Sequence, residues 1–191
     1  MFLKDYYPKL NKKYNKVKFD GIAFDSREVK KGYIFFAIKG NNVDGNKFVK
    51  EAIKKGSKII ISENIKERYE NKILYLKNKN PRKVIAEIAS KINYIRPNNL
   101  IAVTGTNGKS SIANFYYQIL KLNKKKVSSI GTLGISGINY KKNVSNTTFD
   151  PIQLNEILST LKKKKINNVI LEASSHGLKQ HRLDGLKFNL G

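Results

Sequence analysis

A lysine, a serine and two glycines stand together near the middle of the chain, in a pattern that is typical of phosphate binding. The segment is Thr104-Gly105-Thr106-Asn107-Gly108-Lys109-Ser110-Ser111. An apolar run precedes it and apolar residues at helical spacing follow it, so we expect a strand, a loop and a helix in succession. Glycines let the backbone approach a polyphosphate, and amide groups at a helix N-terminus favour an anion. Lys109 would then neutralise the β- and γ-phosphates of a nucleotide, and Ser110 would bind Mg²⁺.

This loop departs at one position from the common pattern G-x-x-x-x-G-K-[ST]. Val103 stands where the first glycine is expected, and Gly105 is the glycine that the loop has instead. A structural glycine turn is the alternative interpretation, because short glycine motifs occur by chance. The position between a predicted strand and a predicted helix favours the nucleotide site.

Glu172 is a carboxylate that could share a metal ion with the loop. It ends the run Asn168-Val169-Ile170-Leu171, which predicts a buried strand. In an open α/β sheet, ligands bind at the carboxyl ends of the strands. A carboxylate there can hold Mg²⁺ together with ATP phosphates, since hard cations prefer oxygen ligands. A solvent-facing glutamate is the alternative, but the phosphate loop in the same domain favours the metal role.

Alternating strand and helix patterns predict an α/β fold with two domains. The pattern breaks at Arg96-Pro97-Asn98-Asn99, so we expect a small α/β domain over residues 1–97 and a second domain over residues 98–191. Strands that alternate with helices favour parallel sheets. The phosphate loop predicts that the second domain binds ATP and is of the P-loop type. Its few elements make a poor core alone, so we expect it to be the first part of such a domain. The chain then reads as the N-terminal portion of a longer protein.

The composition narrows the classes of function. The 38 Lys and Arg against 14 Asp and Glu give a net charge of +24. The excess is spread over both halves, which favours lysines on solvated faces over a nucleic-acid site. The chain has no cysteine, which excludes disulfides, thiolate metal ligands and cysteine nucleophiles. With no long apolar run and no signal-peptide pattern, we expect a cytoplasmic protein that does not bind membrane. We also expect a monomer that does not bind nucleic acid.

Three segments together resemble the Mur ligases in their order and spacing. Asp25-Ser26-Arg27, followed by Gly32 and Phe35-Phe36-Ala37-Ile38-Lys39-Gly40, is similar to the signature of the Mur ligase N-terminal domain. The loop from Thr104 to Ser111 resembles the family's ATP loop in its short form. Glu172-Ala173-Ser174-Ser175-His176-Gly177-Leu178, with Gln180-His181-Arg182, resembles a stretch of the members that form the tripeptide precursor.

The resemblance implies an ATP-dependent amide ligase of peptidoglycan synthesis, and hence a role in cell-wall biogenesis, cell shape and cell division. ATP would phosphorylate the terminal carboxylate of UDP-MurNAc-L-Ala-D-Glu, and the amino group of a diamino acid would attack the acyl phosphate. The implied cofactors are ATP and Mg²⁺, and the implied partners are the UDP-MurNAc-dipeptide and the diamino acid. We expect meso-diaminopimelate as the more widespread choice, and L-lysine stays open because the selecting residues are not present. The family's carbamylated lysine and C-terminal domain are expected beyond Gly191, so the chain alone is expected to be inactive.

The resemblance also implies a role for individual residues. Those for ATP are Gly105, Thr106, Asn107, Gly108, Lys109, Ser110 and Ser111. The implied catalytic residues are Lys109 and Glu172, and the implied metal ligands are Ser110 and Glu172. Those for the uridine diphosphate end are Phe24, Ser26, Asn41, Asn42 and Val43. Those for the muramoyl-peptide part are Asn146, Thr147, Thr148, Ser174, Gln180 and Arg182, the last through its charge. His176 and His181 are expected to be structural or to support other residues, because the family's metal-binding histidine comes later.

Two other functions stay open. A different ligase of the same superfamily, such as a folylpolyglutamate synthetase, would share the ATP loop but not the Asp25-Ser26-Arg27 segment or the stretch after Glu172. A non-catalytic nucleotide- or nucleic-acid-binding module could be built from the same pieces. Binding of the UDP-sugar, of ATP and of an oligonucleotide would separate these alternatives.

Overall fold

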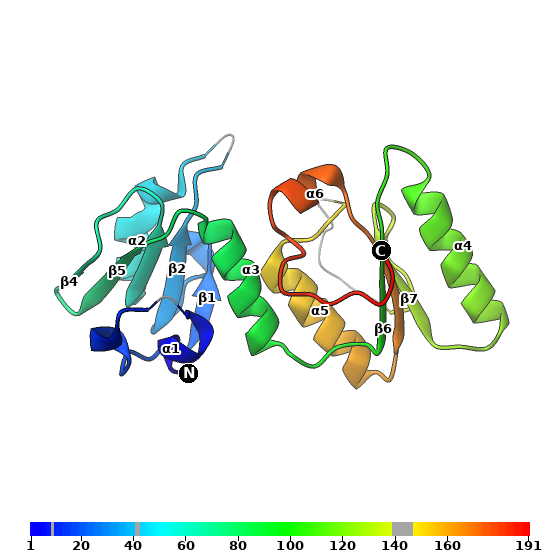
Figure 1. Cartoon of the computed structure of the whole chain (residues 1–191), viewed down its shortest axis with the longest axis horizontal. Helices are drawn as coiled ribbons and strands as arrows, with labels where there is room; N and C mark the ends of the chain where they lie inside the picture. Colours follow the sequence, from blue (N-terminus) through cyan, green and yellow to red (C-terminus); the bar gives the residue numbers. More distant parts are fainter. Residues whose placement is uncertain (9, 41–42, 139–146) are drawn as a thin grey trace. The chain divides into compact units, whose positions relative to one another are not determined.

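The chain folds into two compact units, Met1–Ile88 and Ala89–Gly191. The computed structural model describes every residue except 9, 41–42 and 139–146 (Figure 1). Helix α3 (Pro81–Ile92) crosses the division between the units. The domain boundary expected from the sequence, between residues 97 and 98, stays a prediction.

The first unit is built on a mostly parallel sheet with the strand order β1-β2-β3-β5-β4. Its four parallel strands are β1 (Gly21–Ala23), β2 (Tyr33–Ala37), β3 (Ile59–Ser62) and β5 (Ile73–Lys77). Strand β4 (Arg68–Glu70) pairs antiparallel with β5 at the edge. All three residues of β4 are exposed and two of them are charged, so no local pattern predicts it.

The strands of the first unit carry its core. Phe35, Phe36 and Ile60 are fully buried. Parallel strands are usually covered on both faces, which is why their sequences are continuous apolar runs. The helices are α1 (Leu3–Tyr6), α2 (Val49–Lys54) and the first part of α3. Asn80 caps the start of α3, since its side-chain oxygen accepts a hydrogen bond from the Lys83 amide at 3.1 Å.

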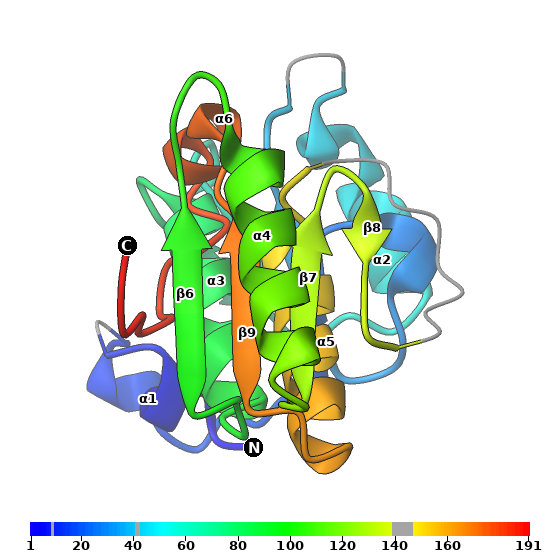
Figure 2. The same ribbon diagram turned by 90° about the vertical axis from the view of Figure 1, so that its right-hand side faces the viewer.

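The second unit contains a four-stranded sheet with the order β6-β9-β7-β8. Its strands are β6 (Asn99–Val103), β7 (Val127–Gly131), β8 (Gly134–Ile135) and β9 (Asn168–Glu172). Strands β6, β9 and β7 are parallel, so their carboxyl ends meet at one edge. Figure 2 shows helix α4 (Lys109–Leu122) on one face of this sheet and helix α5 (Pro151–Lys163) on the other.

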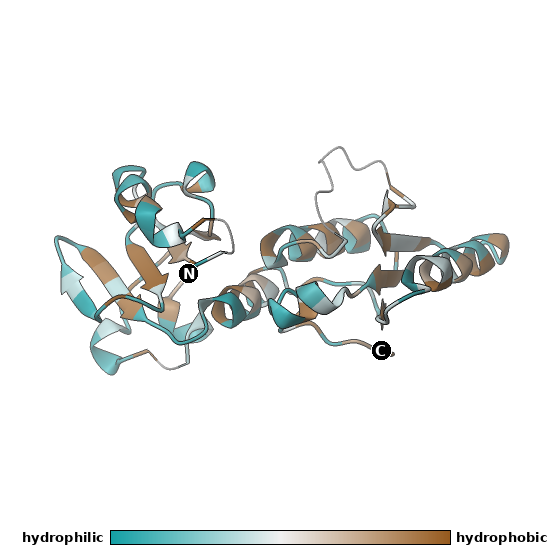
Figure 3. Cartoon of the chain, turned by 90° about the horizontal axis from the view of Figure 1, so that it is seen from above, coloured by the Kyte–Doolittle hydropathy of each residue, from teal (hydrophilic) through white to brown (hydrophobic). Residues whose placement is uncertain are grey.

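Helix α5 contributes four buried side chains to the core of the second unit. Leu154, Ile157, Leu158 and Leu161 are buried against the hydrophobic strands, which are brown in Figure 3. Residues near the chain end add backbone pairing along the edge strand β6. Ala102 donates a backbone hydrogen bond to Leu190 at 3.1 Å, next to β6.

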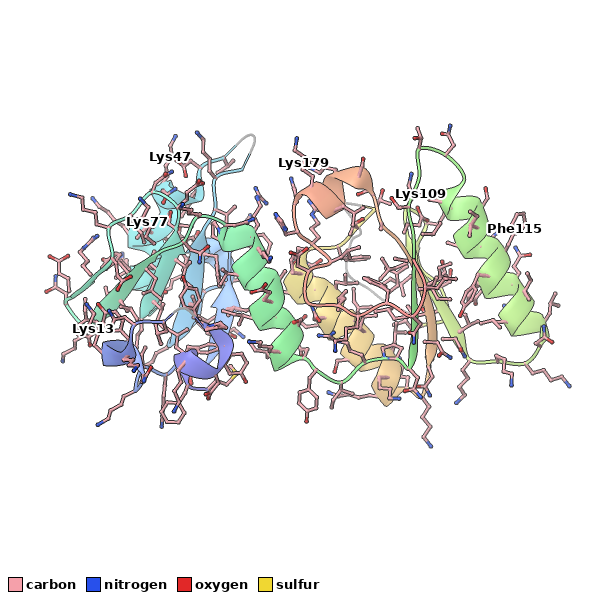
Figure 4. All side chains as sticks on the ribbon, in the orientation of Figure 1. Lys13, Lys47, Lys77, Lys109, Phe115 and Lys179 are labelled. Atoms are coloured by element: carbon pink, nitrogen blue, oxygen red, sulfur yellow. The ribbon has the colours of Figure 1, made fainter. Side chains whose placement is uncertain are left out.

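The face of α4 that turns away from the sheet is apolar. Ile112, Phe115, Ile119 and Leu122 are between 53% and 82% exposed, whereas Ala113 is buried. The helical pattern predicted from the sequence is present, but these four large apolar side chains are exposed. Figure 4 shows Phe115 pointing outward from α4, and the lysines that it labels as Lys13, Lys47, Lys77 and Lys179 are exposed. Within the described residues, no helix is long and apolar enough to cross a bilayer.

The start of α5 gives a test of this fold. Asp150 Oδ1 accepts hydrogen bonds from the amides of Ile152 and Gln153, both at 3.0 Å, and Pro151 follows it. The substitution Asp150→Ala removes this cap and is expected to lower the free energy of unfolding by about 1 kcal/mol. Urea unfolding followed by circular dichroism measures the change. Asp150→Asn, which keeps an accepting oxygen, should retain most of the stability, and equal losses in both variants would contradict the capping role.

Candidate functional site

The loop between β6 and α4 has a backbone that requires glycine at two positions. Gly105 has a φ of 147° and Gly108 a φ of 79°, both outside the range that other residues commonly adopt. A Cβ on Gly108 would meet nothing within 4 Å. Glycine is therefore required here by the backbone conformation and not by a lack of space. The loop therefore turns sharply and remains open to a ligand.

The backbone amides of this loop are unused within the described part of the chain. Residues 104–108 are exposed, and none of the amides of residues 105–111 donates a hydrogen bond there. Such amides at the N-terminus of a 14-residue helix carry partial positive charge. The arrangement fits the phosphate groups of a nucleotide.

Lys109 lies across the same loop. Its Nζ donates hydrogen bonds to the carbonyl oxygens of Gly105 at 2.7 Å and Thr106 at 3.3 Å. Figure 4 shows the residue at the start of α4. Phosphate oxygens would compete well with these carbonyls, because hydrogen bonds between charged groups are stronger than those to neutral acceptors.

Glu172 reaches the loop from the end of β9. The register pairs Glu172 with Val103, the last residue of β6 before the loop. Ser110 Oγ donates a hydrogen bond to Glu172 Oε2 at 3.0 Å. The two residues expected to hold the metal are therefore in direct contact, although they are 62 positions apart in the sequence.

Thr132 and Gly131 complete the surroundings of the Glu172 carboxylate. Thr132 Oγ1 donates to Oε2 at 3.0 Å, and the Thr132 amide donates to Oε1 at 3.3 Å. A Cβ on Gly131 would lie 2.1 Å from Oε1, so only glycine leaves room for the carboxylate. Sequence reasoning missed both residues, because neither belongs to a motif that it used.

The oxygen atoms around Glu172 suit a magnesium ion that is shared with a nucleotide. Glu172 is only 3% exposed, and no residue in the described part of the chain forms an ion pair with it. The described part of the chain contains no group of three or more His, Cys, Asp or Glu residues that could hold a metal ion by themselves. One carboxylate and one hydroxyl would leave the other ligand positions to phosphates and water, which is a common arrangement for Mg²⁺.

A second network joins the residues expected to bind the muramoyl-peptide. Thr148 Oγ1 donates to the backbone oxygen of Glu172 at 3.1 Å and lies 3.1 Å from Ser174 Oγ. Arg182 donates to the backbone oxygen of Thr148 and, at 2.8 Å, to Gln180 Oε1. The structure thus brings these predicted residues together beside Glu172, and Asn146 lies outside the described residues.

The two histidines of this region have local partners. Gln180 Nε2 lies 2.7 Å from His176 Nε2, and His181 Nδ1 lies 3.0 Å from Asp184 Oδ2. Neither contact involves the Glu172 carboxylate. The structural role expected for His176 and His181 is consistent with these contacts and stays a prediction.

The residues expected at the uridine diphosphate end lie in the first unit. Ser26 is buried, and its Oγ donates to Glu51 Oε2 at 3.0 Å, a contact that the sequence does not indicate. Hydrogen bonds from Lys55 and then from Ser26 hold the pKa of Glu51 below its usual value. Phe24 and Val43 are exposed, and Asn41 and Asn42 lie outside the described residues.

Comparison with known proteins gives related descriptions for both units. Residues 18–93 match the family model described as "Mur ligase family, catalytic domain", and residues 103–191 match "Mur ligase middle domain". The UDP-N-acetylmuramoyl-L-alanyl-D-glutamate--2,6-diaminopimelate ligase of Rickettsia prowazekii (strain Madrid E) is 38% identical over 186 residues. The protein of that name in Wigglesworthia glossinidia brevipalpis is 36% identical over 191 residues. Each alignment covers 95% of this chain but 38% of the relative, so the chain spans about two fifths of their length.

Solved structures give the same picture. A structure of a UDP-N-acetylmuramoyl-L-alanyl-D-glutamate--2,6-diaminopimelate ligase superimposes with a TM-score of 0.77 and 27% identity, covering 100% of this chain and 40% of that one. A MurF ligase from Thermotoga maritima in complex with ADP shares the fold, with a TM-score of 0.52 and 23% identity over 83% of this chain and 32% of that one. The two family models together match most of the residues, and the chain belongs to the Mur ligase family.

Proposed function

We propose that the chain is the UDP-sugar- and ATP-binding portion of an amide ligase of peptidoglycan synthesis. The ligase would add meso-diaminopimelate to UDP-MurNAc-L-Ala-D-Glu, which agrees with the names of its relatives. The observation that carries the proposal is the contact between Ser110 and the buried Glu172, beside an open loop with unused amides. We further propose that the protein is a cytoplasmic monomer.

The reaction would proceed in two steps that balance. The terminal carboxylate oxygen of the dipeptide attacks the γ-phosphorus of ATP, which breaks the bond to the bridging oxygen and releases ADP. The amino group of the diamino acid then attacks the acyl phosphate carbon, phosphate leaves, and the amine loses a proton as the amide forms. Negative charge develops on the transferring phosphoryl group in the first step, so the site must neutralise it.

Residues of the second unit would supply this neutralisation. Lys109 would exchange its contacts with Gly105 and Thr106 for phosphate oxygens, and the loop amides would bind the same phosphates. Ser110 and Glu172 would hold Mg²⁺, which supplies positive charge at the phosphates when bound. Thr106, Asn107, Gly108 and Ser111 complete the proposed ATP loop.

The network beside Glu172 would hold the acceptor substrate. Thr147, Thr148, Ser174 and Gln180 present hydroxyl and amide groups, and the Arg182 guanidinium suits the anionic groups of the muramoyl-peptide. We assign Asn146 to the same role. In the first unit, Phe24, Ser26, Asn41, Asn42 and Val43 would bind the uridine diphosphate end. Holding both substrates in a fixed geometry is itself a large part of such catalysis.

The first prediction tests the ligand class. Titration of the purified chain with UDP-MurNAc-L-Ala-D-Glu, with Mg·AMP-PNP (a hydrolysis-resistant ATP analogue) and with a random oligonucleotide, followed by NMR, should show weak saturable binding of the first two. We expect no amide product when ATP and diaminopimelate are added, because the chain spans about two fifths of its relatives. Oligonucleotide binding that weakens with salt, without a response to the UDP-sugar, would favour a nucleic-acid-binding module.

The second prediction concerns Lys109. The substitution Lys109→Ala should weaken Mg·AMP-PNP binding by about tenfold or more, since a charged contact to phosphate is lost. Lys121→Ala is the matched control, because this exposed lysine lies in the last turn of the same helix. NMR titration compares the two variants. Equal affinities in both would contradict the role of Lys109.

The third prediction concerns Glu172. The substitution Glu172→Gln keeps the shape of the side chain but removes the charge that would attract a divalent cation. Nucleotide binding by the variant should therefore lose its dependence on Mg²⁺, measured by titrating AMP-PNP with and without the metal. Glu67→Gln, at an exposed position of the first unit, should bind as the unchanged chain does. A full Mg²⁺ dependence in Glu172→Gln would remove this residue from the proposed metal site.

A further inference from the structure

Thr132 stands in a turn where no sequence motif predicts a function. It is exposed and lies between β7 and β8, directly after Gly131. Its hydroxyl and its amide both contact the Glu172 carboxylate, one on each oxygen. A turn residue that binds both oxygens of a buried carboxylate has its own orientation coupled to that of the carboxylate.

The hydroxyl of Thr132 also reaches the segment expected to bind substrate. Its Oγ1 lies 3.2 Å from Thr147 Oγ1. A threonine hydroxyl has one hydrogen and two lone pairs, and an ionised carboxylate only accepts. The single hydrogen of the Thr132 hydroxyl can therefore point to Glu172 Oε2 or to Thr147 Oγ1, so the orientation of this hydroxyl links the carboxylate to Thr147.

These contacts form one continuous path through the second unit. Ser110 on the ATP loop binds Glu172, Glu172 binds Thr132, and Thr132 contacts Thr147. The next residue, Thr148, continues the path to the backbone of Glu172 and to Ser174. Thr132 is the point where a side chain joins the proposed metal ligands to the proposed substrate segment.

We propose that Thr132 is a positioning residue that couples binding of the magnesium-nucleotide to binding of the UDP-sugar dipeptide. This inference rests on the proposed function. A cation on Ser110 and Glu172 immobilises the carboxylate, and the orientation of the Thr132 hydroxyl follows from it. Thr147 is then already oriented when the sugar arrives, so the second ligand has less disorder to remove. By linkage, the sugar must strengthen nucleotide binding by the same factor.

Three variants separate this coupling from a purely structural role of the turn. Thr132→Val keeps the shape and branching of the side chain but has no hydroxyl, and Thr132→Ser keeps the hydroxyl. Thr160→Val is the matched control, because Thr160 is exposed on α5 and its hydroxyl donates a hydrogen bond to the Glu156 backbone oxygen at 2.8 Å. The measurement is the affinity of each chain for Mg·AMP-PNP by NMR titration, without and with saturating UDP-MurNAc-L-Ala-D-Glu.

In the unchanged chain, the sugar should strengthen Mg·AMP-PNP binding by about fivefold, at the lower end of common coupling. Thr132→Val should lose this enhancement and bind Mg·AMP-PNP alone about tenfold more weakly, since a hydrogen bond to a charged group is removed. Thr132→Ser should behave as the unchanged chain does, and so should Thr160→Val. Rescue by serine is the result that a role in turn shape alone would not produce.

The possible outcomes distinguish this inference from the function on which it rests. If the unchanged chain binds both ligands but neither affects the other, the coupling is overturned and the proposed function stands. The coupling is also overturned if Thr132→Val retains the enhancement, or if Thr132→Ser loses it. If the unchanged chain binds neither ligand, the proposed function fails and this inference fails with it.

Discussion

The buried carboxylate of Glu172, which forms no ion pair with the described residues, is the constraint around which the second unit is arranged. Glu172 is removed from water, and the groups that bind it within the described residues are two hydroxyls and one amide. Burying a charge in this way is costly unless another charge compensates it. The parallel pairing of β9 with β6 places Glu172 next to Val103, where the chain leaves the sheet to form the phosphate loop. The strand register, the open loop and the glycine at position 131 all shape the surroundings of Glu172. A magnesium-nucleotide bound there would supply the positive charge that compensates the carboxylate.

The parts of this site that sequence alone predicts are those set by local chemistry. A glycine loop between a strand and a helix, and a glutamate at the end of an apolar strand, can be read from residue types and spacing. The contact between Ser110 and Glu172 follows, because the carboxyl ends of parallel strands share one edge. The grouping of Thr148, Ser174 and Arg182 was predicted only through the family resemblance, since nothing in their spacing brings two separate segments together.

Other features depend on tertiary structure and left no local pattern. Strand β4 is charged and exposed, and it exists because it pairs with β5. Thr132 contacts Glu172 because the turn after β7 ends at the same edge as β9, and Gly131 is required by the proximity of a side chain 41 positions away in the sequence. Periodicity predicted α4, but the side of the helix that is buried depends on how the helix lies on the sheet. These contacts require the register of the strands, which residue types alone do not specify.

The apolar side of α4 has a consequence for the behaviour of the chain in solution. An exposed apolar surface lies on a molecule of net charge +24, and it consists of Ile112, Phe115, Ile119 and Leu122. At low ionic strength, the positive charge keeps the molecules apart by mutual repulsion. The same charge attracts any polyanion toward the lysines. At physiological ionic strength, the Debye length is about 8 Å, so charge repulsion protects this apolar face less from contact with other molecules. Raising the ionic strength therefore weakens both the repulsion that keeps the molecules apart and the unspecific attraction of anions.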